Sequence, residues 1–585
     1  MKRDCMTEKK ILLQTEKPGR YIGNEINISK KNPREAAVRF AFCFPDVYEV
    51  GMSHLGMQII YSMLNAESGF YCERAFMPWT DYRPDPLCSL ETDSPLGVFD
   101  FLGFTMQYEL GATNALEMLS MAHVPLLASD RDDKNPLVCA GGPCVCNPEP
   151  LADFFDFFYI GEAETVLVNI LSLYAEHKKN GGKRREFLHK INGLDGVYVP
   201  SLKKEGAVVK KVYAADLDAA HFPCKPLVPL IEAVHNRAVV ELARGCARGC
   251  RFCQAGYIYR PMRERSPDTL FAQAANILDC TGYEEISLAS LSASDYSNFL
   301  PFADRLLEYT QPRRVNISLP SLRANAESLA VLEKTQRVRK SSLTVAPEAG
   351  SQRLRDAINK NLTEDEILDG CRMAFESGFD KIKLYFMSGL PTETDADCIE
   401  IARLSEKIVD QYYTLPKEKR RRQVSVNVSV SCFVPKPHTP FEREAQATAE
   451  QFAHKHRLIK NAIRKKQIAF KYHDAEASIL EGIIARGGRE LGRVILRAWE
   501  LGARFDGWTE KFDPAVWRRA FDETGIDPVY FAHRARGPDK PQPWDFVDMG
   551  VGKIFLAGER EKAYAGITTP DCKNNCSNCG ACFNE

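Results

Sequence analysis

Short apolar runs alternate with segments of helical period along the first 225 residues. Four runs are typical of buried strands, at 38–44, 98–106, 136–142 and 155–161. Three intervening segments carry apolar residues at helical spacing, at 57–65, 112–122 and 165–177. This alternation favours a doubly wound α/β sheet of parallel strands. Ligands of such sheets bind beyond the carboxyl ends of the strands, where PDVYEVG, CAGGPCVCNPEP and GEAE lie in this chain.

The same alternation returns over residues 226–445. Six strands are predicted there, at 239–242, 284–290, 315–321, 341–347, 381–387 and 424–434. Ser266 and Pro267 are typical of a helix start, and Thr363 with Glu366 forms a capping-box pattern. Six strand–helix units predict most of a barrel.

Residues 446–585 have a different pattern. The segment 454–502 is basic at first and helical in period, and a Trp-containing irregular stretch and a cysteine-rich tail follow it. The expected fold class is therefore α/β in three parts. These are a doubly wound domain at 1–225, a partial (β/α)6 barrel at 226–445, and a mainly helical accessory region with the tail at 446–585.

Composition agrees with a globular chain of several domains. The 585 residues are 44% hydrophobic and 26% charged, and the net charge of −1 provides no overall field that selects nucleic acid or an anionic membrane. The sequence has no stretch of roughly 18 uninterrupted apolar residues, and its charged N-terminus lacks the apolar core of a signal peptide. We therefore expect a cytoplasmic protein that does not enter a membrane.

Three of the 19 cysteines, Cys246, Cys250 and Cys253, are spaced C-x-x-x-C-x-x-C directly after the first predicted barrel strand. Cytoplasmic thiols stay reduced, so these cysteines are candidate metal ligands. Structural zinc prefers four protein ligands. Three cysteines leave one iron of a four-iron cluster open to a small molecule, at the barrel mouth where barrel chemistry occurs. A zinc knuckle or three structural thiols are the alternatives.

The spacing of these cysteines, the aromatic Phe252 before Cys253, and their place after the first barrel strand resemble the radical SAM superfamily. The resemblance implies that Cys246, Cys250 and Cys253 hold a 4Fe-4S cluster. It also implies reductive cleavage of S-adenosylmethionine to a 5′-deoxyadenosyl radical, with an electron from a donor such as flavodoxin or ferredoxin.

Further S-adenosylmethionine contacts follow from the same resemblance. The superfamily often holds the methionine amino group through a glycine–glutamate motif after the second strand. That motif is absent here, and SLASLSASDY, with Ser290 and Asp295, takes its place.

The loop TVAPEAGSQRLR offers Glu348, Ser351 and Arg353 to the same cofactor. A carboxylate can bind ribose hydroxyls, and a guanidinium can pair with the methionine carboxylate. The turn at Gly389 suits the adenine. A surface ion pair is the alternative for Glu348 and Arg353, and a plain tight turn for Gly389.

The N-terminal segment 140–164 resembles the cobalamin-binding domains that precede many radical SAM barrels. The resemblance implies that cobalamin contacts Gly141, Gly142, Gly161 and Glu162, because glycine lets a ligand approach the backbone. The D-x-H-x-x-G motif that supplies a lower cobalt ligand is missing. His54 has the wrong spacing, and we expect it to cap a helix or contact a loop. Three further cysteines are expected to be small buried residues, namely Cys139, Cys144 and Cys146.

Motifs along almost the whole chain, from PGRYIGNE to TTPDCKNNCSNCGACF, resemble an uncharacterised bacterial family of cobalamin-binding radical SAM proteins. The segment FVPKPHTPF at 433–441 also resembles methylthiotransferases that act on transfer RNA or ribosomal protein. This chain lacks their cysteine-rich N-terminal domain and any obvious C-terminal RNA-binding barrel.

The tail carries four cysteines in eleven residues, Cys572, Cys576, Cys579 and Cys582. Four thiolates suit either a structural zinc ion or a second iron–sulfur cluster, and both remain open. A zinc knuckle could also touch single-stranded RNA. The basic runs at 417–423 and 454–471 are interpreted as solvated helix faces, with a phosphate-binding groove as the alternative.

The sequence therefore predicts a radical SAM enzyme that uses cobalamin to methylate an unactivated carbon. A methylthiotransferase-like insertion of sulfur into RNA or ribosomal protein is one alternative. An RNA-associated binding protein stabilised by structural metals is another. No motif identifies the substrate.

Overall fold

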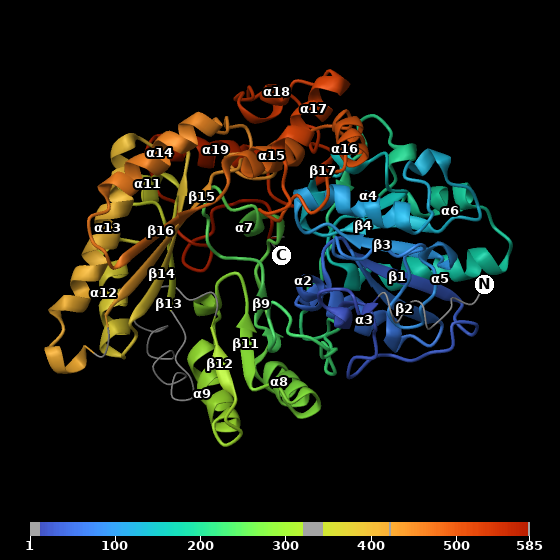
Figure 1. Cartoon of the computed structure of the whole chain (residues 1–585), viewed down its shortest axis with the longest axis horizontal. Coiled ribbons are helices and arrows are strands. Elements are labelled where there is room, and N and C mark those ends of the chain that lie inside the picture. The colour runs from blue at the N-terminus through green and yellow to red at the C-terminus, as the bar shows by residue number, and fades with distance from the viewer. Residues whose placement is uncertain (1–11, 320–342, 421–422, 583–585) are drawn as a thin grey trace.

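The computed structural model describes residues 12–319, 343–420 and 423–582. The N-terminal sheet and its helices lie on one side, the strands of the partial barrel lie on the other, and C-terminal helices run across both (Figure 1). The predicted strand ends at 320–321 and 341–342, and residues 421–422 of the first basic run, lie outside the described residues.

The N-terminal sheet has the strand order β2-β1-β3-β4-β5-β6. Its strands are β1 Val38–Phe44, β2 Phe70–Phe76, β3 Phe101–Thr105, β4 Leu137–Gly141, β5 Phe157–Tyr159 and β6 Val197–Tyr198. All pairs are parallel except β5 with β6. The chain passes from β1 to β2 on one side and then to β3 on the other, which creates a topological switch point where such sheets bind ligands.

All four predicted N-terminal strands are confirmed, but the sequence pattern missed β2. The run FYCERAF contains Glu73 and Arg74, so it does not read as an apolar strand. Both side chains are fully buried. Arg74 pairs with Glu25 at 2.8 Å and with Glu91 at 2.6 Å, and these partners come from distant loops that the local pattern cannot reveal.

Helices cover both faces of this sheet. Helices α3 Leu55–Ala66 and α5 Leu167–Lys179 pack on the face that carries Phe40 and Phe42. Helix α4 Ala112–Met121 packs on the opposite face, together with four helices of the accessory region. These are α15 Ala475–Arg486, α16 Leu491–Glu500, α17 Pro514–Thr524 and α18 Pro528–Ala532. The accessory region therefore completes the core of the N-terminal domain.

The barrel strands form two parallel sheets, β12-β11-β8 and β13-β14-β15-β16. The strands are β8 Ala238–Glu241, β11 Glu285–Ala289, β12 Asn316–Ser318, β13 Leu343–Glu348, β14 Lys381–Ser388, β15 Ser425–Cys432 and β16 Ile468–Tyr472. The helices between them are α8 Pro267–Thr281, α9 Phe299–Thr310, α11 Gln352–Ala357, α12 Glu364–Glu376 and α13 Asp395–Thr414. The predicted strands and the predicted helix caps at Ser266 and Thr363 are confirmed.

The expectation of helical structure throughout 454–502 is wrong for residues 468–472. Helix α14 Ala449–Ala462 ends before this segment. Strand β16 then pairs in parallel with β15, and the first residue pair is Val426 with Ile468. The barrel sheet therefore extends beyond residue 445. The local sequence has a weak helical period, but the free edge of β15 offers hydrogen-bond partners to a strand. The segment forms a strand because strand preference depends on the neighbouring strand.

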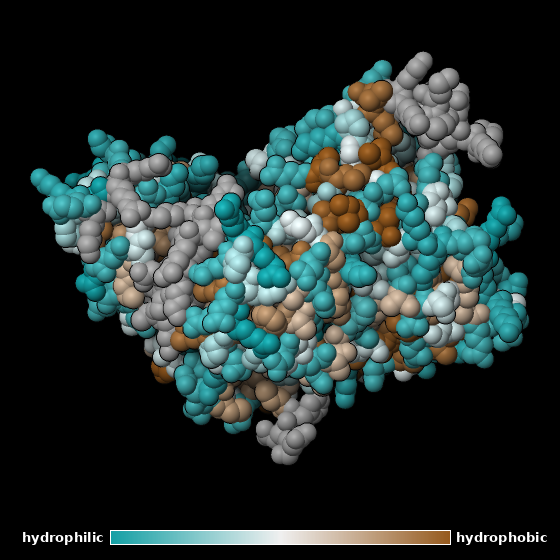
Figure 2. All heavy atoms as spheres, turned by 90° about the horizontal axis from the view of Figure 1, so that it is seen from below, coloured by the Kyte–Doolittle hydropathy of each residue, from teal (hydrophilic) through white to brown (hydrophobic). Residues whose placement is uncertain are grey.

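After helix α19 Lys553–Tyr564 the chain returns to the centre of the molecule (Figure 1). The loop that contains α7 Ala255–Ile258 also lies there. The face seen from below carries mostly hydrophilic side chains, with hydrophobic ones in smaller groups between them (Figure 2). Among the described helices, none combines the length and the apolarity that a bilayer crossing requires.

Gly350→Ala tests the packing that positions the loop after β13. A Cβ at Gly350 would lie 2.2 Å from the backbone nitrogen of Ile401 in α13, and backbone cannot move aside cheaply. We expect a loss of about 1–3 kcal/mol in the free energy of unfolding, measured by denaturant titration. Gly193→Ala is the matched control, because a Cβ there meets nothing within 4 Å. Equal stability of the two variants would contradict this packing.

Candidate active site

The three predicted cysteine ligands lie in a loop that two short strands close. Strand β9 Ala243–Arg244 pairs antiparallel with β10 Arg263–Glu264, and the loop between them contains Cys246, Cys250, Cys253 and α7. Gly245 begins the loop with a φ of +82°, and a Cβ there would lie 2.7 Å from the carbonyl oxygens of Tyr259 and Pro261. Only glycine fits where the loop returns so closely on itself.

The three thiols lie within electrostatic reach of one another. Burial and the neighbouring Cys250 together raise the pKa of Cys246 to about 11 and that of Cys253 to about 12. A metal centre would deprotonate them on binding. Among the described residues, no group of three or more His, Cys, Asp or Glu side chains has the arrangement that binds a single metal ion. The donor set of three thiols fits a larger iron–sulfur cluster with one open iron better than a four-ligand zinc site.

Arg251 connects the cysteine loop to the barrel and to the C-terminal region. This residue follows Cys250 in the sequence, and its side chain is 0% exposed. It donates to the carbonyl oxygens of Ala357 at 2.9 Å and Ile567 at 2.7 Å, and pairs with Glu559 of α19 at 3.1 Å. A barrel helix and the C-terminal region are therefore both tied to the loop.

Asp295 was predicted to contact S-adenosylmethionine, but its carboxylate faces Arg248 of the cysteine loop. Arg248 Nε donates to Asp295 Oδ2 at 2.8 Å, and Arg248 Nη1 donates to Asp571 Oδ2 at 2.9 Å. The contacts favour a role for Asp295 in positioning the loop. Ser290, at the end of β11, accepts a hydrogen bond from Ser292 and faces the cavity described below.

The predicted residues of the loop after β13 are engaged with protein groups. Ser351 caps α11 by accepting from Leu354 N at 3.2 Å and donates to Asp397, and Arg353 pairs with the same carboxylate. Glu348 has a φ of +67° and lies 3.2 Å from Lys360. These contacts favour the ion-pair alternative for Glu348 and Arg353.

Two other predicted residues support the barrel mouth. Gly389 has a φ of +82°, and a Cβ there would lie 2.6 Å from the Phe452 ring, which favours the tight-turn alternative. Phe252 packs with Met387 against the small apolar cluster that contains Leu390. This aromatic ring therefore lies between the cysteine loop and the end of β14.

A cavity of about 470 Å³ lies between the N-terminal domain and the barrel. Five predicted site residues line it together, Gly141, Gly142, Gly161, Glu162 and Ser290. The N-terminal side comes from the carboxyl ends of β1, β3, β4 and β5 and from α3 and α5. The barrel side includes Arg244 and Gly245 at the start of the cysteine loop. The cavity therefore occupies the topological switch point of the sheet and reaches the cysteine loop.

Aromatic and aliphatic side chains form the inner walls of the cavity, between the sheet and its helices. They include Phe40, Phe42, Ile59, Phe157 and Leu167. His54 also faces it, but His54 Nδ1 accepts from Met57 N at 3.1 Å and caps α3, as the sequence predicted. Burial lowers the pKa of His54 to about 4, so this imidazole is neutral at pH 7.

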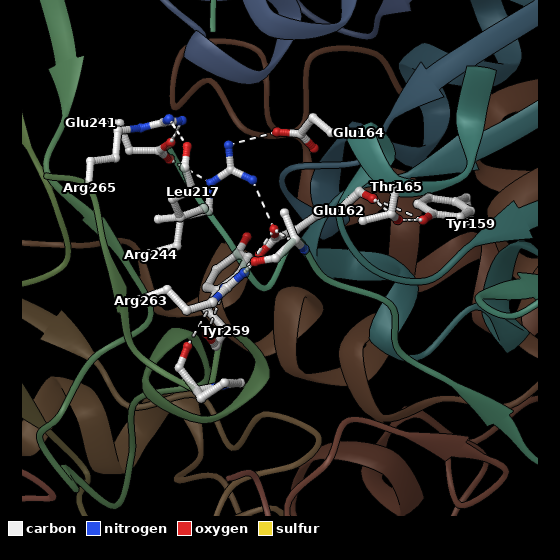
Figure 3. Close-up of polar contacts among 12 residues, drawn as sticks. Tyr159, Glu162, Glu164, Thr165, Leu217, Glu241, Arg244, Tyr259, Arg263 and Arg265 are labelled. Carbon is white, nitrogen blue, oxygen red and sulfur yellow. Dashed lines mark hydrogen bonds and ion pairs between the residues drawn. The ribbon is translucent and has the colours of Figure 1, made fainter. Parts of the chain in front are cut away.

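Ion pairs across the mouth of the cavity join the two domains (Figure 3). Arg244 lies 2.9 Å from Glu162 and 2.7 Å from Glu164, and Arg263 lies 2.7 Å from Glu162. Burial raises the pKa of Glu162, but the hydrogen bond from Arg263 and the charges of both arginines outweigh it and leave that pKa below its usual value. Glu162 therefore lines the cavity and also bridges the domains.

The segment FVPKPHTPF meets the loop after β4 beside the cysteines. Gln254, next to Cys253, donates to Cys146 Sγ at 3.1 Å and to the carbonyl oxygen of Pro437 at 3.2 Å. Lys436 lies 2.6 Å from Glu109 and 2.7 Å from Glu481. Cys139 and Cys146 are buried as predicted, whereas Cys144 is half-buried.

Three residues of the basic run 454–471 pair with acidic side chains of α13 and its preceding turn. Lys455 lies 2.7 Å from Glu393, His454 lies 3.0 Å from Asp395, and Lys465 pairs with Asp410. These three pairs fit the interpretation of a solvated helix face, while Arg457 and Lys460 of the same run are exposed to solvent.

Sequence reasoning missed the arginines that organise the site, Arg244, Arg248, Arg251 and Arg260. For the first three, the signal was present in ARGCARGCRFC, where arginines alternate with the cysteines, whereas Arg260 lies beyond this stretch. Arg260 borders a second cavity, of about 270 Å³, together with Cys246 and the tail residues Cys572, Cys579 and Cys582. One cysteine of the loop and three cysteines of the tail therefore line the same cavity.

Comparison with known proteins agrees with this architecture. The model described as radical SAM proteins, N-terminal, matches residues 56–200, and the radical SAM superfamily model matches residues 240–405. The fold and the cysteine loop are those of a radical SAM enzyme. The chain is 30% identical over 461 residues to the uncharacterized protein MJ0966 of Methanocaldococcus jannaschii, covering 78% of this chain and 90% of that protein. It belongs to the same radical SAM family as that protein.

Two further similarities are more distant. The anaerobic magnesium-protoporphyrin IX monomethyl ester cyclase of Cereibacter sphaeroides is 23% identical over 420 residues, and the match covers 70% of this chain and 63% of the cyclase. The cobalamin-dependent S-adenosylmethionine radical enzyme OxsB, with aqua-cobalamin bound, shares the fold with a TM-score of 0.51 at 13% identity. That match covers 83% of this chain and 71% of OxsB.

Glu162→Gln tests the bridge between the domains. The amide keeps the shape but removes the charge that faces Arg244 and Arg263, and we expect a loss of about 1–3 kcal/mol in the free energy of unfolding at pH 7. Because the folded pKa of Glu162 lies below its usual 4.5, its stabilisation is fully present above that value and is lost as pH falls through the folded pKa.

Denaturant titrations from pH 7 down to pH 3 measure this difference. The difference in the free energy of unfolding between wild type and Glu162→Gln should disappear at acid pH. Glu523→Gln removes a partly exposed carboxylate that pairs with Arg497 and Arg519, and serves as control. A gap that is as small for Glu162→Gln as for the control, or one that is independent of pH, would contradict the role assigned to Glu162.

Proposed function

We propose that this radical SAM enzyme binds cobalamin in the cavity between its domains and methylates an unactivated carbon of its substrate. In this proposal Cys246, Cys250 and Cys253 hold a 4Fe-4S cluster whose open iron binds S-adenosylmethionine. When bound, the cluster and cobalamin would supply reductive cleavage of S-adenosylmethionine to a 5′-deoxyadenosyl radical and a transferable methyl group. The observation that carries the proposal is a single cavity lined by both the sheet switch point and the start of the cysteine loop.

The residues around the loop suit it to hold a cluster in one position. Arg251 ties the loop to the barrel and to α19, while Arg248 ties it to Asp295 and to the tail. Cys246 and Cys253 are half-buried, which limits the access of water to the thiols. Phe252 packs beside the barrel mouth and closes the apolar side of the loop. These contacts support a fixed cluster with one side facing the barrel interior.

The large cavity suits part of a corrinoid in shape and chemistry. Its inner walls are apolar between the sheet and helices α3 and α5, and Gly141 leaves the backbone at the end of β4 open to a ligand. His54 already caps α3, so we propose that this histidine does not serve as the lower cobalt ligand. OxsB, which shares the fold, is described with aqua-cobalamin bound, in agreement with this proposal.

The substrate is proposed only as a molecule with an unactivated carbon. RNA or a ribosomal protein would fit the methylthiotransferase-like alternative. We propose a flavodoxin or ferredoxin as the source of electrons.

Cys246→Ala tests the cluster assignment. Loss of one of three ligands should remove the iron of the loop and abolish cleavage of S-adenosylmethionine, because the open iron is no longer held. Iron content and formation of 5′-deoxyadenosine are measured after anaerobic reconstitution with dithionite as the reductant. Cys224→Ala changes an exposed thiol far from the loop in sequence and should keep both. Cleavage by Cys246→Ala at the wild-type rate would refute the assignment.

Gly141→Val tests the cobalamin site. A Cβ at Gly141 meets only Tyr159 O at 3.7 Å, so the fold accepts valine while its methyl groups enter the cavity. We expect cobalamin bound per chain to fall well below the wild-type ratio, measured by absorbance after desalting. Gly69→Val adds the same side chain just before the amino end of β2, whereas Gly141 lies at the carboxyl end of β4. The Gly69→Val variant should bind cobalamin as the wild type does. Absence of cobalamin from the wild type, or equal binding by both variants, would contradict the proposal.

A further inference from the structure

The C-terminal tail, residues 569–582, is docked on the cysteine loop. Cys572 N donates to the carbonyl oxygen of Ala247 at 3.0 Å, inside the C-x-x-x-C segment. Asp571 accepts from Arg248 of the same loop at 2.9 Å. The C-terminal end of the chain accordingly lies in the middle of the molecule, between the two domains (Figure 1).

Further contacts fix the tail on either side of its cysteines. Lys573 Nζ lies 2.8 Å from Glu264 and 2.9 Å from Ser297 Oγ of the barrel. On the other side, Gly552 N donates to the carbonyl oxygen of Cys579 at 2.9 Å. Thr569 N donates to Asn359 of the barrel at 2.8 Å. The tail is thus bound through backbone and side chains and has a definite position.

Three of the four tail thiols, those of Cys572, Cys579 and Cys582, line one cavity. Cys579 is buried, while Cys572, Cys576 and Cys582 are exposed. Neither the fold nor the proposed reaction otherwise needs four reduced thiols at one place.

The cavity beside the tail links this group to the catalytic loop. Cys246 lines it with Cys572, Cys579 and Cys582, and its volume of about 270 Å³ is more than a single ion occupies. Arg260 and Lys573 also line it, and their charges would offset the negative charge of coordinated thiolates. A structural zinc ion needs no such space beside Cys246, and it carries no electron.

We infer that Cys572, Cys576, Cys579 and Cys582 hold a second iron–sulfur cluster that relays electrons to the cluster of the cysteine loop. The relay rests on the proposed function. A one-electron donor of the flavodoxin or ferredoxin class is oxidised, and the tail cluster is reduced. The tail cluster then returns to its oxidised state by reducing the loop cluster, and the electron finally breaks one C–S bond of S-adenosylmethionine to give methionine and the radical. The exposed tail thiols face the solvent, where the donor can dock.

Metal analysis of the full chain tests the site itself. After anaerobic reconstitution, Cys576→Ser/Cys582→Ser should lose about half of the iron and sulfide of the wild type, and Cys250→Ala should lose the other half. Mössbauer spectra should show a separate cluster missing from each variant. Zinc in the tail of the wild type, or unchanged iron in the tail variant, would overturn the inference. Cys224→Ser, another exposed thiol, is the matched control and should keep all of the iron.

Two reductants test the relay. With flavodoxin and its reductase, cleavage of S-adenosylmethionine by the tail variant should fall about tenfold or more, but with dithionite it should stay within about twofold of wild type. An equal loss with both reductants would show that the tail only supports the loop, and no loss with either would exclude a relay. Absence of cleavage by the wild type with dithionite would refute the proposed function instead, while the iron count would still decide the tail site.

Discussion

Arginines within and beside the cysteine loop hold the three parts of this protein together. Arg244 reaches the N-terminal domain through Glu162 and Glu164, and Arg251 reaches α19 through Glu559. Arg248 pairs with Asp295 of the barrel and Asp571 of the tail. Each guanidinium presents several donors in a fixed plane, so one side chain can bind partners from two segments at once. The position of the loop depends on all three parts being in place.

This arrangement has an electrostatic cost and a functional consequence. Buried charges are expensive unless they are paired and hydrogen-bonded, and the side chain of Arg251 meets that condition through one carboxylate and two well-placed carbonyl oxygens. Cations also surround the places where metal-bound thiolates would carry negative charge. The same contacts that dock the domains therefore create the surroundings that an anionic cluster requires, and they close the cavity at the mouth of the N-terminal sheet.

The strongly periodic segments of this chain were predictable from the sequence alone. The predicted strands and the caps at Ser266 and Thr363 lie where local pattern and tertiary structure agree. The cysteine spacing predicts a metal-binding loop for a similar reason, because ligands supplied by one loop lie close together in the chain. The strand β2 escaped prediction because its charged residues are neutralised by distant partners, and β16 because an available strand edge overrode a helical period.

The sequence by itself determined the family and most of the order of the strand–helix units, and it predicts the cysteine ligands, since these depend on local spacing and composition. Only the tertiary structure decided that Gly141, Glu162 and Ser290 line one cavity, and that the tail lies against Cys246. It also showed that Ser351, Arg353 and Asp295 are already engaged by protein partners. Such facts depend on contacts between residues that are tens to hundreds of positions apart, and local pattern carries no information about which distant charge or thiol will be the neighbour.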